Sequence, residues 1–197
     1  PNHFMPKDSL YWLTASAAIK GKGFDLYSAR TSSLLQATIS DIKYGRNSVS
    51  EIQLNGRLKN HAYELQLVSG YPLALLKASV SGILQRNKAE MNLDAQVEHL
   101  NLYRLHLVDV PLSTAFRFEA NASSNLNEIL HLTGRLTQWE LSGEEKTYYP
   151  QDTRFEAGTT HDSTYFEITA GDAFMKLNSD QGATKLSASL SLITDRL

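Results

Sequence analysis

The chain has 197 residues, a mass of 22.0 kDa and a formal net charge of -2, and 42% of its residues are hydrophobic. Its lysines and arginines are scattered singly along the sequence, so there is no basic run that predicts binding to nucleic acid or to an acidic membrane surface. The absence of cysteine excludes disulfides, thiolate catalysis and Cys-type zinc sites, and no run approaches the roughly 18 apolar residues of a membrane helix.

Strands are predicted within residues 10–44. Residues 10–20 alternate apolar and polar side chains, and residues 24–29 follow as a second strand, which together predict a hairpin. Residues 34–44 also alternate, but the apolar parity changes between Ile39 and Ile42. Such a change indicates a β-bulge or a short helical turn.

The strongest pattern covers residues 50–97, which alternate almost without interruption. A period of two predicts β-strands that have one apolar face each. Turn-forming or charged residues interrupt the alternation at 59–60, 69–72 and 86–88. We therefore expect about four antiparallel strands that follow one another as a meander.

Further alternation continues to the C-terminal part of the chain. Within residues 98–112 the leucine parity changes, which predicts one tight turn before a short strand. Strands are expected at 115–122, 129–141, 154–157, 165–170 and 173–177. Residues 187–197 fit either a last strand or a helix.

A short pattern recurs along the chain. LNGRL at 54–58 returns as LTGRL at 132–136, with a looser copy, VSGIL, at 80–84. The central glycines are Gly56, Gly82 and Gly134, so the intervals are 26 and 52 residues. This spacing suits stacked hairpin units and predicts weak repeats near 50–84 and 126–142, within a single segment that spans 1–197. The pattern Leu-x-Gly-x-Leu can also arise by chance in a leucine-rich β-protein.

The residue patterns of common enzymes are absent from the sequence. The six histidines are dispersed, and no Gly-x-Ser-x-Gly or P-loop motif is present. No metal site or cofactor can be argued, and we expect a protein that is not an enzyme. Trp139, Tyr148 and Tyr149 could form an aromatic platform for sugars, although packing at the edge of a sheet is the simpler interpretation.

Five stretches together resemble one known family. They read GKGFDL at 21–26, IQLNGRLKNHAYELQL at 52–67, DAQVEHLNLYRLHLVDVPL at 94–112, HLTGRL at 131–136 and ITAGDAFMKL at 168–177. This succession is similar to the TamB (translocation and assembly module) proteins in the form seen in Bacteroidetes, which belong with the AsmA-like group. The similarity spans nearly the whole chain, and it lies in patterns of strand and turn.

The resemblance implies an all-β fold, mainly an extended antiparallel sheet rolled into an open groove, with at most one or two short helices. It also implies a periplasmic internal segment of a longer protein that is anchored in the inner membrane and engages an Omp85-type (TamA-like) outer-membrane partner. The implied function is to carry phospholipid acyl chains between the two membranes and to support outer-membrane biogenesis and protein secretion. As an internal segment, the chain would leave one edge of each terminal strand unpaired.

The apolar parity of the predicted strands supplies the candidate wall of the groove. Its members are Leu54, Leu58, Tyr63, Leu65, Leu67, Val80, Leu84, Met91, Leu93, Val97, Phe116, Phe118, Leu132 and Leu136. The same alternation fits a closed β-sandwich, in which these residues pack against a second sheet. Such a sandwich could serve an exported protein as a binding module for glycans or proteins.

Overall fold

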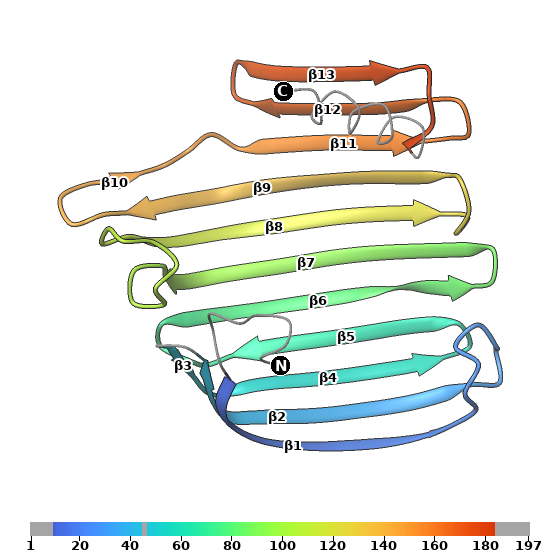
Figure 1. Ribbon diagram of the computed structural model, residues 1–197, viewed down its shortest axis with the longest axis horizontal. Coiled ribbons are helices and arrows are strands. Elements are labelled where there is room, and N and C mark those ends of the chain that lie inside the picture. The colour runs from blue at the N-terminus through green and yellow to red at the C-terminus, as the bar shows by residue number, and fades with distance from the viewer. Residues whose placement is uncertain (1–9, 45–46, 184–197) are drawn as a thin grey trace.

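The computed structural model describes residues 10–44 and 47–183, and every element in these ranges is a strand. The thirteen strands form one sheet (Figure 1). They are β1 (Leu10–Lys22), β2 (Ser32–Tyr44), β3 (Asn47–Val49), β4 (Ile52–Lys59), β5 (Ala62–Ser69), β6 (Ala74–Gln85), β7 (Lys88–Asn101), β8 (Ser113–Ser124), β9 (Leu130–Ser142), β10 (Thr147–Tyr148), β11 (Thr153–Thr159), β12 (Thr164–Ala170) and β13 (Ala173–Ser179).

The sheet is an antiparallel meander, which confirms the expected fold class. Its order is β1-β2-β4-β5-β6-β7-β8-β9-β11-β12-β13, with β3 added to β2 and β10 added to β9. Antiparallel neighbours can be joined by short turns, and the four strands expected within 50–97 are β4 to β7. Within the described residues, β1 pairs only with β2 and β13 only with β12, so each has one free edge.

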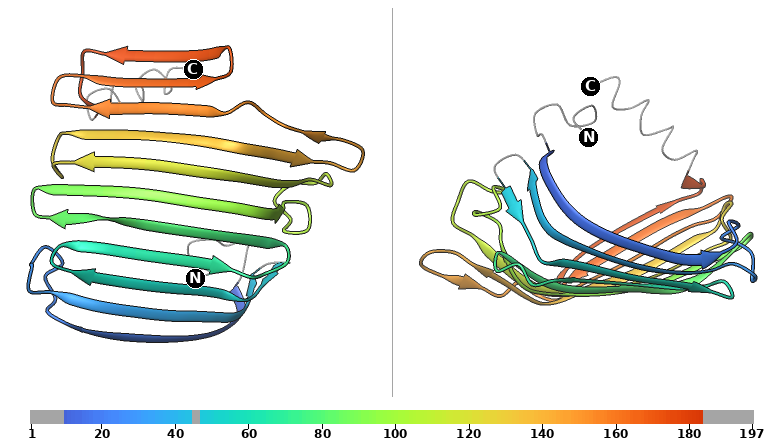
Figure 2. Two further views of the ribbon diagram at one scale, coloured as in Figure 1. Left: turned by 180° about the vertical axis from the view of Figure 1, so that it is seen from behind. Right: turned by 90° about the horizontal axis from the view of Figure 1, so that it is seen from below.

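The sheet is curved and does not close. Seen along the direction in which the strands are stacked, each long strand bends into an arc, and the sheet forms a trough that opens toward the viewer of Figure 1 (Figure 2). The trough axis therefore runs across the strands, from β1 to β13. No helix in the described ranges has the length and apolar character to cross a membrane.

A single layer leaves the chain without a conventional core. The accessible surface is 14011 Å², whereas a folded globular chain of this mass exposes about 9,300 Å². Among the described residues the buried apolar side chains are Leu58, Ala74, Val97, Leu105 and Ala120. The closed sandwich that the alternation also allowed is therefore wrong, because the strands of residues 10–44 and 47–183 form one open sheet and no second sheet covers it there.

The strand expected at residues 24–29 is wrong. This segment is a loop, and β1 pairs with β2 instead. The carbonyl oxygen of Asp25 accepts bonds from the Ser28 amide at 3.0 Å and the Thr31 hydroxyl at 2.6 Å, and its side chain accepts from the Tyr27 amide. Turn formation by an aspartate thus overrides a short alternating pattern.

The short strand expected after the turn within 98–112 is also wrong. β7 ends at Asn101, and residues 102–112 remain irregular. The Asn101 side chain accepts from the Arg104 amide at 2.8 Å, while its backbone carbonyl accepts from the Leu105 amide at 3.0 Å. These bonds hold a compact turn, with Leu105 buried beneath it.

The parity change in β2 is a β-bulge, which was one of the two alternatives predicted there. Ile39 pairs with Ala15 and Asp41 pairs with Thr14, which leaves Ser40 without a residue opposite it on β1. The expectation for residues 187–197 lies outside the described part of the chain.

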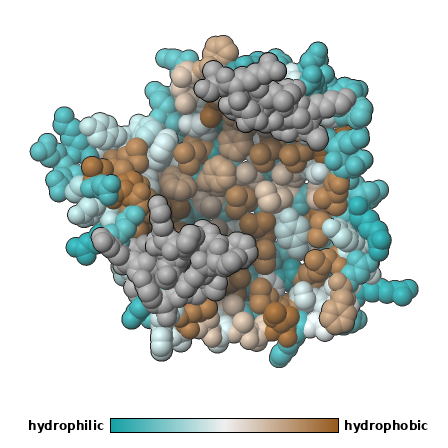
Figure 3. Space-filling model, viewed as in Figure 1, coloured by the Kyte–Doolittle hydropathy of each residue, from teal (hydrophilic) through white to brown (hydrophobic). Residues whose placement is uncertain are grey.

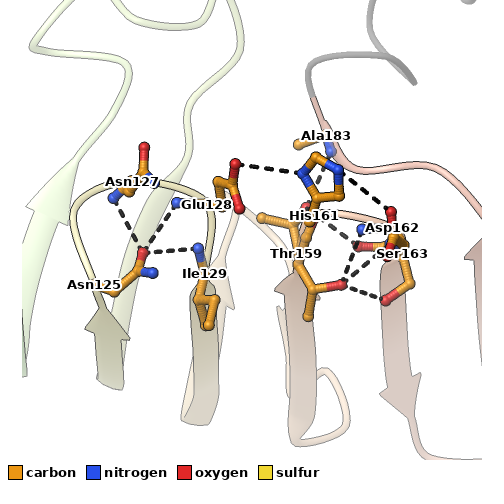
Figure 4. Close-up of polar contacts among 10 residues, drawn as sticks. Asn125, Asn127, Glu128, Ile129, Thr159, His161, Asp162, Ser163 and Ala183 are labelled. Atoms are coloured by element: carbon orange, nitrogen blue, oxygen red, sulfur yellow. Dashed lines mark hydrogen bonds and ion pairs between the residues drawn. The ribbon is translucent and has the colours of Figure 1, made fainter.

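Side-chain acceptors organise the loops at one end of the sheet (Figure 4). The Asn125 side chain accepts from the backbone amides of Asn127, Glu128 and Ile129 between β8 and β9. From the loop between β11 and β12, His161 Nδ1 lies 3.3 Å from Glu128 Oε1. This contact joins two loops across the β9–β11 pair.

Ion pairs cross the polar face of the central strands. Arg117 lies between Asp94 and Glu119, at 2.7 Å and 3.1 Å, and Arg135 bonds to the other oxygen of Glu119. These residues come from β7, β8 and β9, so the pairs tie three neighbouring strands together. The bond from Arg135 lowers the pKa of Glu119 below its ordinary value.

A Glu119→Gln variant should lose less stability in acid than the unmodified chain. A carboxylate whose pKa is lowered by folding stabilises the fold above its ordinary pKa of about 4.3, and this contribution is lost as the pH falls through the lower folded value. The measurement is the melting temperature by circular dichroism between about pH 5 and pH 2.5. Glu64→Gln is the control, because the Glu64 carboxylate accepts from the neutral Gln66 amide. Identical acid profiles for Glu119→Gln and the unmodified chain would contradict the prediction.

Candidate functional site

The register of the sheet aligns apolar residues into rows that cross eleven strands. Directly paired residues of antiparallel strands project from the same side of the sheet. The central row is Ile19, Leu35, Gly56, Leu65, Val80, Leu93, Ala120, Gly134, Phe155, Ile168 and Met175. Ten spacings of about 4.8 Å give this row a length of roughly 48 Å.

Two further rows flank the central row on the same face. One is Ala17, Ala37, Leu54, Leu67, Ala78, Ala95, Phe118, Leu136, Thr153, Ala170 and Ala173, and the other is Gly21, Ser33, Leu58, Tyr63, Gly82, Met91, Ala122, Leu132, Ala157, Phe166 and Leu177. None of the three rows contains a charged residue. We call these three rows the trough floor.

The trough floor lies on the concave face. Figure 3 shows apolar side chains gathered over the middle of this face, with hydrophilic side chains around its rim. The side chains are only partly covered: Leu65 is 39% exposed and Met175 is 56% exposed. A water-exposed apolar surface of this extent is typical of a site that contacts a hydrophobic partner.

All fourteen candidate groove residues project from this face. Eleven lie in the trough floor: Leu54, Leu58, Tyr63, Leu65, Leu67, Val80, Met91, Leu93, Phe118, Leu132 and Leu136. Leu84, Val97 and Phe116 lie on the same side, each two residues along its strand from a floor position.

Sequence reasoning left out the floor residues at both ends of the trough. Ile19 and Leu35 belong to β1 and β2, while Phe155, Phe166 and Ile168 belong to β11 and β12. The same period of two is present in these strands. This alternation could have identified the end residues if the prediction had extended the apolar parity beyond the longest alternating stretch.

A stacked aromatic pair lies within the floor. The ring centroids of Phe118 and Phe155 are 6.2 Å apart and their planes differ by 16°. Gly134 makes this possible, because a Cβ there would lie 2.4 Å from the Phe155 ring. The glycine of the LTGRL motif thus provides room for a large floor side chain on the next strand.

The three motif glycines all lie on the trough face, but on strands of different direction. Gly56 and Gly82 belong to β4 and β6, which run the same way and are one hairpin apart. Gly134 belongs to β9, three antiparallel steps from β6, so its strand runs the opposite way. Two stacked hairpin units therefore do not account for the 52-residue interval.

Two polar side chains on this face have partners within the sheet. Tyr63 donates its hydroxyl to the Glu90 carbonyl at 3.1 Å, and burial raises the pKa of Tyr63. Thr114 is 7% exposed, donates to the Glu140 carbonyl and accepts from the Trp139 indole at 3.2 Å. These internal bonds allow polar atoms to remain beneath an apolar surface.

The comparisons leave the chain without an assigned family: no family model, no curated protein and no solved structure matches it. The resemblance to TamB proteins consequently stays a prediction.

The aromatic residues considered for a sugar platform differ in their surroundings. Trp139 is half-buried and engaged by Thr114, whereas Tyr149, in the loop after β10, is 74% exposed. In the part of the chain that the structure describes, no group of three or more His, Asp or Glu side chains is arranged to hold a metal ion.

Proposed function

We propose that the chain is a lipid-carrying segment of a TamB-like protein, in which phospholipid acyl chains lie on the trough floor. The observation that carries the proposal is a largely apolar surface that crosses eleven strands of an open sheet and has no charged residue in its three rows. In this proposal the chain is not an enzyme, requires no cofactor and does not bind nucleic acid.

The size of the hydrophobic effect explains why such a surface suits this role. Moving an acyl chain of about 16 carbons through water costs on the order of 13 kcal/mol, at about 0.8 kcal/mol for each methylene. A path that crosses eleven strands offers apolar contact at every step of about 4.8 Å. An acyl chain could therefore move along the rows without full exposure to water.

The proposed setting follows the family resemblance. The chain would be a periplasmic segment of an inner-membrane-anchored protein, and the full-length protein would engage an Omp85-type (TamA-like) partner in the outer membrane. Both edges of the described sheet are compatible with continuation by further strands, because β1 and β13 each have one neighbour in the described residues.

Photocrosslinking tests the position of the lipid. A photoreactive amino acid at Leu65 or Leu93, both in the central row, should capture phospholipid in cells and in vesicle mixtures. The matched controls are Gln66, which follows Leu65, and Asn92, which precedes Leu93. Both project from the polar face. Capture from the controls but not from the floor positions would contradict the proposal.

A further inference from the structure

The loop between β1 and β2, residues 23–31, presents large apolar side chains to solvent, and we call it the tip loop. Phe24 is fully exposed, Leu26 is 54% exposed and Tyr27 is 41% exposed. The tip loop lies at the same end of the sheet as the turn between β4 and β5 (Figure 1). Exposed apolar side chains gathered on one short loop are typical of a site that contacts a hydrophobic partner.

Hydrogen bonds hold the tip loop in this form. The hydroxyl of Thr31, whose exposure is only 4%, donates to the Asp25 carbonyl at 2.6 Å, and the Thr31 amide donates to the Ser28 carbonyl at 3.0 Å. The Asp25 carboxylate accepts from the Tyr27 amide and, at 3.0 Å, from Arg86 in the turn between β6 and β7. The loop thus satisfies its polar groups internally while its apolar side chains stay outside, so binding a partner requires little further ordering.

Five cations surround the tip loop. They line one pocket of about 1040 Å³ beside the strand ends, and no aspartate or glutamate belongs to its lining. Among the described residues no ion pair includes any of the five, and Asp25, the one acid of the loop, is already paired with Arg86. The chain has a net charge of -2, so this corner departs from the average surface. The five cations are Lys20, Lys22, Arg30, Arg57 and Lys59.

The strand register places most of this charge close to the end of the sheet. Lys22 and Lys59 are the last residues of β1 and β4, and Lys20 and Arg57 lie two residues, or about 7 Å, farther from the loop. All four project from the polar face, opposite the trough floor. A surface that meets the strand ends, rather than either face, therefore contacts the tip loop first and the cations next.

A lipid bilayer has the same order of layers. Its headgroup region is roughly 5–7 Å thick on each side of the hydrocarbon core. Lysine and arginine can extend their apolar stems so that the charged ends reach the headgroups. Apolar side chains at the boundary of the acyl chains, with cations at the depth of the phosphates, are the composition of segments that lie in a membrane interface.

We infer that the tip loop docks edge-on onto an anionic phospholipid bilayer. Phe24 and Leu26 enter the boundary between headgroups and acyl chains, and the five cations contact the lipid phosphates. The unneutralised positive charge beside uncharged apolar side chains favours this partner over a protein surface. This inference does not depend on lipid carriage by the trough floor, because it uses the end of the sheet rather than its concave face.

A fluorophore on the tip loop tests the inference. The chain contains no cysteine, so Phe24→Cys gives the purified 197-residue chain a single attachment site for nitrobenzoxadiazole. Vesicles of phosphatidylcholine and phosphatidylglycerol in equal parts should raise its fluorescence, and lipids spin-labelled near the headgroups should quench it. The matched control is Leu107→Cys. Leu107 is 62% exposed but follows the other end of β7, away from the turn that contacts the tip loop, and its fluorophore should not respond.

Charge variants test the role of the cations. Lys22→Gln/Lys59→Gln should weaken binding to the same vesicles at least about tenfold at low salt. The control is Lys77→Gln/Lys176→Gln, which removes the same charge from exposed lysines paired with Glu98 and Glu167. Circular dichroism verifies that both variants fold.

Four outcomes would overturn the inference. Absence of a response at Phe24 would exclude a bilayer and leave the tip loop to a protein partner. Equal responses at Phe24 and Leu107 would show that any exposed apolar position enters the vesicle. Equal loss of binding in the two double variants would mean that bulk charge is the cause. Loss of vesicle binding in a folded Leu93→Glu chain would show that the trough floor, rather than the tip loop, holds the membrane.

Discussion

A Gly82→Ala variant should lose about 2–3 kcal/mol of unfolding free energy, the largest stability effect expected from so small a change in this chain. Gly82 lies near the C-terminal end of β6, and a Cβ there would lie 1.8 Å from the backbone oxygen of Glu90 and 2.9 Å from the Tyr63 hydroxyl. The first of these atoms is backbone and cannot rotate away. The strands would have to separate, and the bond from Tyr63 to the Glu90 carbonyl would be disturbed.

Urea unfolding, followed by far-ultraviolet circular dichroism, measures this effect. Gly143→Ala is the matched control, because its Cβ would lie 3.5 Å from the nearest atom, the Lys146 oxygen, at ordinary contact distance. The control should change stability by no more than about 0.5 kcal/mol. Equal midpoints for the two variants would show that β6 and β7 do not approach as closely as the structure has them.

A Leu93→Glu variant should remain folded but lose acyl-chain binding. Leu93 lies in the central row between Val80 and Ala120, and it is half-buried rather than enclosed. A carboxylate at this position would have to give up water whenever an acyl chain lay over it, which is unfavourable. We expect the affinity for a phospholipid with a fluorescent acyl chain to fall at least about tenfold, equivalent to about 1.4 kcal/mol.

The control for this change is Asn92→Glu. It introduces the same side chain one residue away, on the polar face opposite the trough floor. Affinity measured by fluorescence anisotropy should be unchanged in this variant. If a folded Leu93→Glu chain bound the lipid as tightly as the unmodified chain, the trough floor would not be the surface that holds the acyl chain.

Strand positions were predictable wherever alternation was long and turn residues were clear. The four strands of residues 52–101 and the strands at 113–124 and 130–142 follow the expected order. Prediction was wrong for the strand at 24–29 and for the short strand after the turn within 98–112, because Asp25 and Asn101 form local hydrogen bonds that compete with strand pairing. The alternation in one sequence does not reveal whether the local turn or the paired strand is more stable.

The sequence by itself determined which side chains share a face. A strand has a period of two, so the fourteen candidate residues had to project together once the strands formed in register. Alternation also determined that this face would be apolar and that the opposite face would be polar. It did not determine whether the apolar face would be covered, because an open sheet and a sandwich require the same pattern.

Tertiary structure decided the curvature and the openness of the sheet, and which charged residues meet at its ends. Five cations that line one pocket beside the ends of β1, β2 and β4 are separated along the chain by as many as 39 positions and appear in the sequence as isolated charges: Lys20, Lys22, Arg30, Arg57 and Lys59. Pairing of β2 with both β1 and β4 brings them to one end of the sheet. Charges spread along a sequence meet only when the register of non-adjacent segments is fixed, and that register is a property of the folded sheet.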